Sequence, residues 1–294
     1  MRLSTYPEEP TPGGRGDRAT RDTIPGMTDK TFRFGVVAGQ IGRLADWTAL
    51  ARRTESQGYR TLLSPDPLGG LDPFTALAAA AAVTADLHVG TFVAVSGLRD
   101  RHLLAWQADS LHRLTGGRFE LGLGTGRPGA EKTAERLGVH YGTRGERVAQ
   151  LRETLAHLQR QPDRPSILVA AGGPRMLALA GQHADTVTLA WHPTATETDA
   201  RAMIDPVRNS GRDVELAMNL LAVGDEPAPW LERFIGTTVA DLFAAGSLSV
   251  LPGDPHRAAD ELLRRRDELG LSYFTINSGY ADRLAPVVEL LDGR

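Results

Sequence analysis

Residues 118–131, RFELGLGTGRPGAE, are the stretch from which the fold of this chain can be worked out. In its first half Phe119, Leu121 and Leu123 recur at every second position, and a period of two predicts a short strand. Glycines then stand at positions 122, 124 and 126, with Thr125 between the last two. Glycine at a strand end allows a turn, or the close approach of another backbone or a flat ligand, and the stretch alone leaves these interpretations open.

Strands of this kind recur on both sides of residues 118–131, and helical sequence follows each one. Strands are expected at residues 33–39, 59–64, 87–95, 118–123, 166–171, 186–190, 214–223 and 271–277. Helices are expected to begin near residues 46, 72, 101, 144, 174, 196, 254 and 282. Alternation of this kind predicts a parallel sheet in an α/β protein, and eight repeats predict closure into a (β/α)8 TIM barrel. An open doubly wound sheet is the alternative.

Two segments fall outside the alternation. Residues 1–29 are rich in proline and glycine and poor in large apolar side chains, so we expect a disordered N-terminal extension before a barrel domain at residues 30–294. Met27 stands just before the first strand and is a candidate for the physiological start. Residues 226–253 interrupt the rhythm between strand seven and the following helix. They predict an insertion over the barrel mouth or, alternatively, a plain packing hairpin.

Composition narrows the function classes. A chain of 294 residues with 41% hydrophobic content suits one large α/β domain, and a net charge of -3 offers no basic field for nucleic acid. The absence of cysteine excludes disulfides, thiol nucleophiles and cysteine metal sites, and we expect no metal. No apolar run reaches the length of about 18 residues that spans a membrane. Without a secretory signal, the expected location is the cytoplasm.

Candidate site residues follow from the predicted barrel, because chemistry in this fold lies where strands end and loops begin. We single out Asp66, Arg127 and His192 as candidate catalytic residues. The candidate cofactor-binding residues at the same strand ends are Phe92, Val93, Thr125, Gly126, Ala170, Ala171, Gly172, Gly173, Pro174 and Arg175.

The junction after strand five is the most specific of these. Gly172 and Gly173 precede a helix that Pro174 can open, so free backbone N–H groups and the positive helix end would suit a phosphate. Arg175 could add a charge-assisted contact. The alternative is a tight strand-to-helix turn that needs glycine only for its geometry. Together with the Gly-Thr-Gly junction one strand earlier, the motif favours an extended phosphate-bearing cofactor across adjacent loops.

Several short motifs in this order resemble the bacterial luciferase-like superfamily and, within it, the coenzyme F420-dependent oxidoreductases. They are VGTFV at 89–93, RH at 101–102, TGGR at 115–118, GLGTG at 122–126, AAGGP at 170–174 and AD at 184–185. The resemblance implies a (β/α)8 barrel with a deazaflavin or flavin at its mouth and the phosphate near Gly172 and Gly173. It also implies a cis peptide bond between Phe92 and Val93 behind the ring, and a homodimer through barrel helices.

Two positions depart from the family pattern. Where the family often has Asp-His after strand two, this chain has Asp66-Pro67, and Arg127 replaces the glutamate of the sugar-phosphate-oxidising members. Neither proline nor arginine serves as a general acid, which argues against a sugar-phosphate substrate. Asp66 is then a candidate acid or a turn cap. Arg127 either binds an anion or faces solvent, and His192 is either titratable or structural.

Three functions fit these observations. The first is an F420-dependent oxidoreductase that transfers a hydride to or from a small organic molecule. The second is an FMN-dependent luciferase-like monooxygenase, and the third is a non-catalytic ligand-binding barrel. Aromatic residues expected in the mouth loops, Trp191, Trp230, Phe234 and Phe243, favour an apolar substrate.

Overall fold

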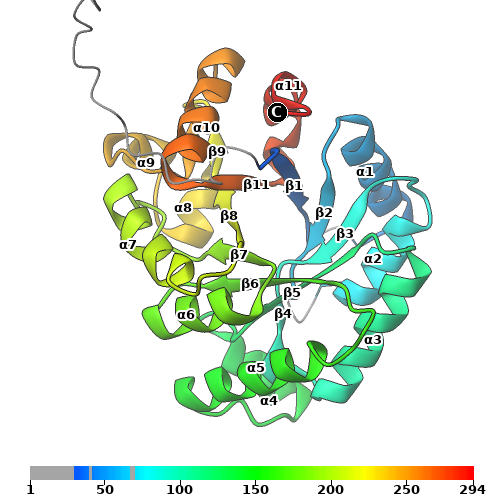
Figure 1. The fold of residues 1–294 in the computed structure, drawn as a ribbon. Helices are drawn as coiled ribbons and strands as arrows, with labels where there is room; N and C mark the ends of the chain where they lie inside the picture. Colours follow the sequence, from blue (N-terminus) through cyan, green and yellow to red (C-terminus); the bar gives the residue numbers. More distant parts are fainter. Residues whose placement is uncertain (1–29, 40–41, 67–69) are drawn as a thin grey trace, which may run out of the picture.

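The protein folds into a closed (β/α)8 TIM barrel, as the alternating sequence predicts (Figure 1). The computed structural model describes residues 30–39, 42–66 and 70–294, so the expected extension at 1–29, Met27 and Pro67 lie outside the described residues. The ring of parallel strands closes where β3 pairs with β5. Its strands are β1 Arg33–Val37, β2 Thr61–Ser64, β3 His88–Thr91, β4 Ala94–Val95, β5 Phe119–Gly124, β6 Ser166–Ala171, β7 Thr186–Leu189, β8 Glu215–Leu220 and β11 Leu271–Asn277.

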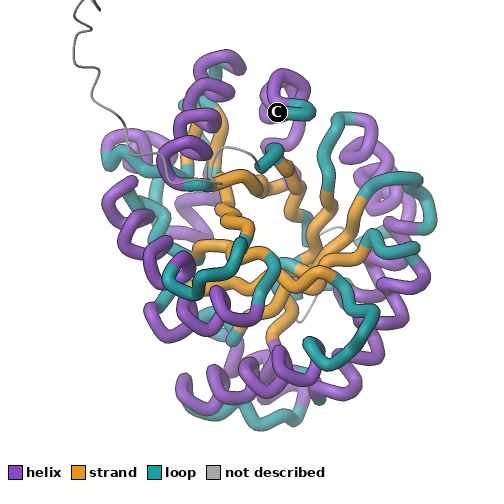
Figure 2. Tube along the Cα trace, viewed as in Figure 1, coloured by secondary structure: helices purple, strands orange, loops and turns teal. Residues whose placement is uncertain are grey.

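Helices surround this ring, as the coloured tube of Figure 2 shows. Capping follows the sequence signals: Asp72 accepts a hydrogen bond from Thr75 N, and Asp254 accepts one from Arg257 N, each just before a proline at the helix start. The main helices are α1 Leu44–Ser56, α2 Pro73–Ala81, α3 Arg101–Leu114, α5 Arg144–Leu158, α6 Pro174–His183, α7 Glu197–Arg208, α10 Pro255–Leu269 and α11 Ala281–Leu291. In the described part of the chain, no helix qualifies as a membrane span.

Two details differ from the expected elements. The strand expected at 87–95 is broken at Phe92–Val93 into β3 and β4. The peptide bond at the break is cis, which confirms the expectation from the family resemblance. An additional helix, α4 Ala130–Leu137, follows β5. The α4 helix was not expected from the sequence, because only Ala130 and Ala134 are buried and its apolar stripe is too short to stand out.

The insertion after the seventh barrel strand contains two short helices and is not a hairpin. It comprises β9 Ala222–Val223, α8 Pro229–Ile235, α9 Val239–Ala244 and β10 Val250–Leu251, with β9 and β10 paired in parallel. Leu248 N donates to Ala195 O at 2.9 Å, which joins the insertion to the loop after β7. Arg265, 3% exposed, donates to Leu248 O at 2.6 Å and to Val250 O at 3.1 Å and so anchors the end of the insertion.

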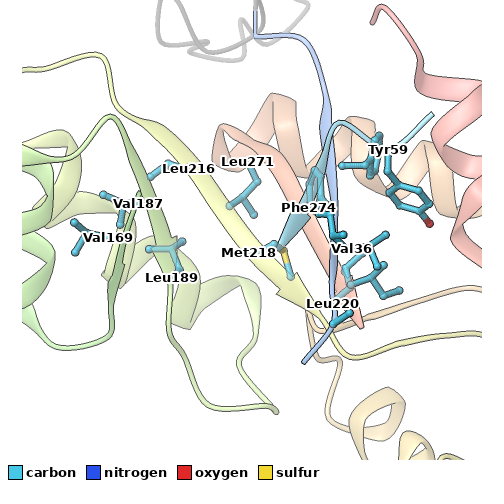
Figure 3. Close-up of a cluster of buried hydrophobic side chains, with 14 of the residues drawn as sticks. Val36, Tyr59, Val169, Val187, Leu189, Leu216, Met218, Leu220, Leu271 and Phe274 are labelled. Carbon is cyan, nitrogen blue, oxygen red and sulfur yellow. The ribbon is translucent and has the colours of Figure 1, made fainter. Parts of the chain in front are cut away.

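The main core lies between the strands and the helices. Figure 3 shows part of this layer, with Val169, Val187 and Leu189 in one group and Val36 and Phe274 in another. A smaller cluster of Leu63, Leu168, Ala217 and Tyr273 fills the barrel interior, because strand side chains alternate between the two faces.

Charged residues occupy the end of the barrel where the strands begin. Arg33 Nη2 lies 3.2 Å from Glu120 Oε1 and 3.1 Å from Glu215 Oε2, and Thr186 Oγ1 donates to Glu215 at 2.9 Å. Burial raises the pKa of the Glu120 carboxyl, and the nearby Arg33 opposes that rise. These contacts join several strands at the face opposite the active-site face of this fold, where residues serve stability.

Candidate functional site

The wall of the barrel mouth is formed where β5 approaches the break between β3 and β4. A Cβ atom added at Gly122 would lie 1.9 Å from Thr91 O, and one at Gly124 would lie 2.8 Å from Val93 Cγ2. Thr91 Oγ1 also donates to Gly122 O at 2.7 Å. The first two glycines of the Gly-x-Gly series are therefore needed for the close approach of strand three. Phe92 and Val93 remain half-buried at this wall.

The Gly-Thr-Gly turn packs against Tyr141. Gly126 has a φ of 85°, and a Cβ atom there would lie 2.2 Å from the Tyr141 hydroxyl oxygen. That hydroxyl donates to Thr125 O at 3.3 Å, and the Arg147 guanidinium lies 4.3 Å from the centre of the Tyr141 ring. Gly126 is thus required by the turn itself, whereas the half-buried Thr125 hydroxyl has no hydrogen-bond partner among the described residues.

The two glycines before α6 have different structural roles. A Cβ atom at Gly172 would lie 2.5 Å from Ala190 O, so the end of β7 leaves no room for a side chain there. Gly173, the N-cap, has ordinary extended angles (φ -111°, ψ 157°), and an added Cβ would meet only Arg144 Nη2, at 3.2 Å. Neither strain nor backbone contact requires glycine at 173. The space beside it therefore remains open for a ligand.

The N-terminus of α6 also has unused hydrogen-bond donors. Gly173 provides no side-chain cap, and the first backbone bond of the helix runs from Leu177 N to Gly173 O at 2.9 Å. The N–H groups of Arg175 and Met176 consequently have no partner inside the helix. A phosphate fits such an end, because these donors and the helix dipole both favour negative charge.

Three arginines line the groove that begins at this helix end. The groove lies between α5 and α6 and has a volume of about 830 Å³. Arg144, Arg152 and Arg175 line it, are exposed, and have no carboxylate partner among the described residues. Sequence reasoning found Arg175 but missed Arg144 and Arg152. The usable signal was that consecutive helices lie side by side in a barrel, which brings the basic α5 next to the start of α6.

Both carboxylate oxygens of Asp66 accept hydrogen bonds from neighbouring residues. Its Oδ1 accepts from Arg99 Nη2 at 3.0 Å, while its Oδ2 accepts from Arg99 Nη1 and from Val95 N at 3.2 Å. Burial alone would lower the pKa of the Arg99 guanidinium, but pairing with Asp66 and Asp72 outweighs burial and raises it. Of the two roles considered for Asp66, these contacts favour the structural one over proton transfer.

Arg127 and His192 are both exposed. The Arg127 side chain has no ion pair among the described residues. His192 Nδ1 lies 2.8 Å from Thr194 Oγ1 and accepts from Thr194 N at 3.3 Å, an arrangement that stabilises a local turn. No hydrogen bond or ion pair links Asp66, Arg127 and His192 to one another in the described ranges, so they do not form an acid–base group.

A further polar side chain, Asn219, was missed by sequence reasoning. Asn219 and Thr275 share the inward face of their strands with Ala217 and Tyr273, and Thr275 Oγ1 donates to Asn219 Oδ1 at 2.9 Å. That bond leaves the Asn219 amide N–H groups as donors on the half-buried inward face. The available signal was a single amide in the otherwise apolar stretch LAMNLLAV.

The aromatic residues expected in the mouth loops are not brought together. Trp191 and Trp230 pack against the main core, and Phe243 lines a separate groove with Arg257 and Arg264. The Phe234 side chain lies outside what the structure describes. The expectation of an apolar substrate therefore gains no support from these side chains.

Comparison with known proteins agrees with this geometry. The family model of luciferase-like monooxygenases matches residues 27–161. A 5,10-methylenetetrahydromethanopterin reductase of Methanolobus tindarius is 28% identical over 184 residues, covering 55% of this chain and 56% of the reductase. The match thus spans little more than half of the length of that relative.

Two solved structures share the fold. An F420-dependent secondary alcohol dehydrogenase in complex with an F420–acetone adduct has a TM-score of 0.68 at 16% identity, covering 88% of this chain and 98% of that one. A riboflavin lyase with modified FMN and riboflavin has a TM-score of 0.69 at 15% identity, covering 89% and 92%. Residues 27–161 of the chain are therefore similar to the luciferase-like monooxygenase family, and the chain folds as a (β/α)8 barrel.

Proposed function

We propose that the protein is an oxidoreductase that transfers a hydride between coenzyme F420 and a small organic substrate. The observation that carries this proposal is the anion site at α6, where uncapped N–H groups, an open position at Gly173 and the guanidinium of Arg144 meet. The Ala-Ala-Gly-Gly-Pro turn that forms it resembles the deazaflavin enzymes. The likeness to an F420-dependent alcohol dehydrogenase supports the same choice of cofactor.

The residues of this chain would share the work of binding. The backbone N–H groups of Arg175 and Met176 would donate to the phosphate, and the guanidinium of Arg144 would offset its charge. Phe92 and Val93 would support one face of the ring. Asn219, whose amide N–H groups have no acceptor among the described residues, would orient the ring edge or the substrate. When bound, the cofactor supplies the hydride chemistry itself, so the protein needs mainly to position the reactants.

The experiment that tests this proposal is a titration of the purified protein with F420 and, separately, with FMN, followed by fluorescence. We expect F420 to bind with a dissociation constant at least tenfold lower than that of FMN. Tighter binding of FMN would favour an FMN-dependent monooxygenase, the alternative suggested by the family description and by the riboflavin lyase. Binding of neither would leave a non-catalytic barrel.

A further inference from the structure

We infer that Asp66 and Arg99 are positioning residues that hold the Phe92–Val93 segment where the cofactor ring would rest. The inference rests on the proposed function for its consequence, but its structural part stands on contacts in this chain. Asp66 is 10% exposed and Arg99 14% exposed at their side chains, so the pair is shielded from solvent. Both charges are matched, since the guanidinium bonds both carboxylate oxygens of Asp66.

The first step is that backbone pairing between β2 and strand three stops at the mouth. The ladder runs from Thr61 with His88 to Ser64 with Thr91, and Phe92 N donates to Ser64 O at 2.8 Å. Beyond that point, Val95 N donates to Asp66 Oδ2 at 3.2 Å. A side chain therefore takes over from the backbone in setting the distance between the end of β2 and the end of β4.

The second step is that Arg99 ties this carboxylate to a third element. Arg99 Nη2 lies 3.0 Å from Asp72 Oδ2, and Asp72 Oδ1 caps α2 by accepting from Thr75 N at 3.0 Å. The Arg99 guanidinium also lies 5.5 Å from the centre of the Phe74 ring. The Arg99 guanidinium thus joins the end of β2, the end of β4 and the start of α2. Two of these elements precede Phe92 in the sequence, and β4 follows Phe92.

The third step is that, beyond the Phe92 N–Ser64 O bond, the wall is also held by its contacts with β5. Val93 Cγ2 fills the space where Gly124 lacks a side chain, and β4 pairs with β5 through Ala94 and Val95. Loss of the Asp66 carboxylate would leave the segment held by the contacts with β5 and, before the break, by the bond from Phe92 N to Ser64 O. We therefore expect the segment to shift or loosen toward the mouth, where a flat ring would lie.

The chain offers a matched control at the opposite end of the barrel. Arg164 Nη1 and Nη2 bond Asp185 Oδ2 and Oδ1 at 2.6 and 3.0 Å, and Ile167 N donates to Asp185 Oδ2 at 2.9 Å. This pair repeats the chemistry of the Asp66 site, with one aspartate, one bidentate arginine and one strand N–H. It lies where β6 and β7 begin, away from the mouth.

The test compares Asp66→Asn with Asp185→Asn in the full chain. Hydrogen exchange, followed by mass spectrometry on peptides that cover residues 92–95, should be at least tenfold faster in Asp66→Asn and unchanged in Asp185→Asn. This readout needs no cofactor. The dissociation constant for F420 should rise about tenfold in Asp66→Asn, with a shifted absorption band of the bound cofactor. Both should stay at wild-type values in Asp185→Asn.

Arg99→Lys provides the conservative variant, and it keeps the charge but loses the two-pronged contact. It should give intermediate exchange and an intermediate dissociation constant, and it serves if Asp66→Asn does not fold. Unchanged exchange at residues 92–95 in both site variants would overturn the inference, as would equal effects on F420 binding in Asp66→Asn and Asp185→Asn. If the wild-type protein binds no F420, the proposed function fails. The exchange comparison still decides whether Asp66 and Arg99 hold residues 92–95 in place.

Discussion

Replacing Gly173 by valine should weaken cofactor binding and leave the cofactor-free protein almost as stable as before. Gly173 has extended angles that valine adopts readily. Among the described residues an added Cβ would meet the tip of Arg144, a flexible side chain. A substitution of this kind changes the free energy of unfolding by about 0.5 kcal/mol or less. In a barrel of this size that corresponds to a shift in Tm of about 1 °C.

The same substitution fills the space that a phosphate would occupy. Losing one charge-assisted hydrogen bond to an N–H group costs about 1.5–3 kcal/mol. Since about 1.4 kcal/mol corresponds to a tenfold change, the dissociation constant for F420 should rise by roughly 10- to 100-fold. Fluorescence titration gives the dissociation constant, and thermal unfolding followed by circular dichroism gives the Tm of the cofactor-free protein.

Gly172→Ala is the matched control, with the opposite expectation. Its new Cβ would lie 2.5 Å from Ala190 O, a backbone atom that cannot move aside cheaply. Overpacking of this kind costs about 1–3 kcal/mol, which lowers the Tm by roughly 2–6 °C. If Gly173→Val kept its affinity for F420 but lost several degrees in Tm, position 173 would prove to serve the turn alone, and the reasoning for a phosphate site would be refuted.

Three further perturbations test other parts of the structure. Arg144→Ala should raise the dissociation constant for F420 roughly fivefold or more at low salt and less at high salt, because a partly exposed charge is screened; titrations at two salt concentrations check this, and a salt-independent effect would contradict it. Arg265→Met should lower the free energy of unfolding by about 3 kcal/mol, since Leu248 O and Val250 O lose their buried donor; urea unfolding measures the loss, and a value below about 1 kcal/mol would argue against the anchor. Burial, with help from nearby arginines, lowers the pKa of His88 to about 4, so its contribution to stability is complete above the unfolded-state pKa of about 6.5 and is lost as the pH falls toward 4. Between pH 7 and pH 4 the free energy of unfolding should therefore fall less in His88→Gln than in the wild-type protein. An equal fall in both proteins would count against the lowered pKa of His88.

Much of the fold could be predicted because its signals are local. Each barrel strand is a short apolar run with a turn residue behind it, and pairs such as Asp72-Pro73 and Asp254-Pro255 announce helix starts. These features depend on residues within a few positions of each other. The α4 helix was missed, and the predicted insertion was not recognised as helical, because the apolar stripes of these helices are too short to show a period.

The candidate site was predicted less completely, because its residues acquire meaning only from distant neighbours. The strand-end positions followed from the barrel rule, and the cis bond at Phe92–Val93 followed from the family resemblance. The aromatic residues of the mouth loops were expected together, yet Trp191 and Trp230 are partly buried and pack against the core. Whether a side chain expected in a loop lines a site or packs against a core depends on tertiary packing, which a local sequence pattern does not indicate.

The eight strands, their order and the glycine-rich junctions could be predicted from the sequence, since periodicity and turn chemistry are properties of adjacent residues. The role of each junction depends instead on contacts with residues that are distant in sequence. Gly122 is required by Thr91 on another strand, Gly172 by Ala190, and Gly173 by neither. Likewise, Asp66 became a held carboxylate because Arg99 lies across from it. Steric contact and ion pairing act over a few ångströms, and only folding brings residues that are distant in sequence within that range.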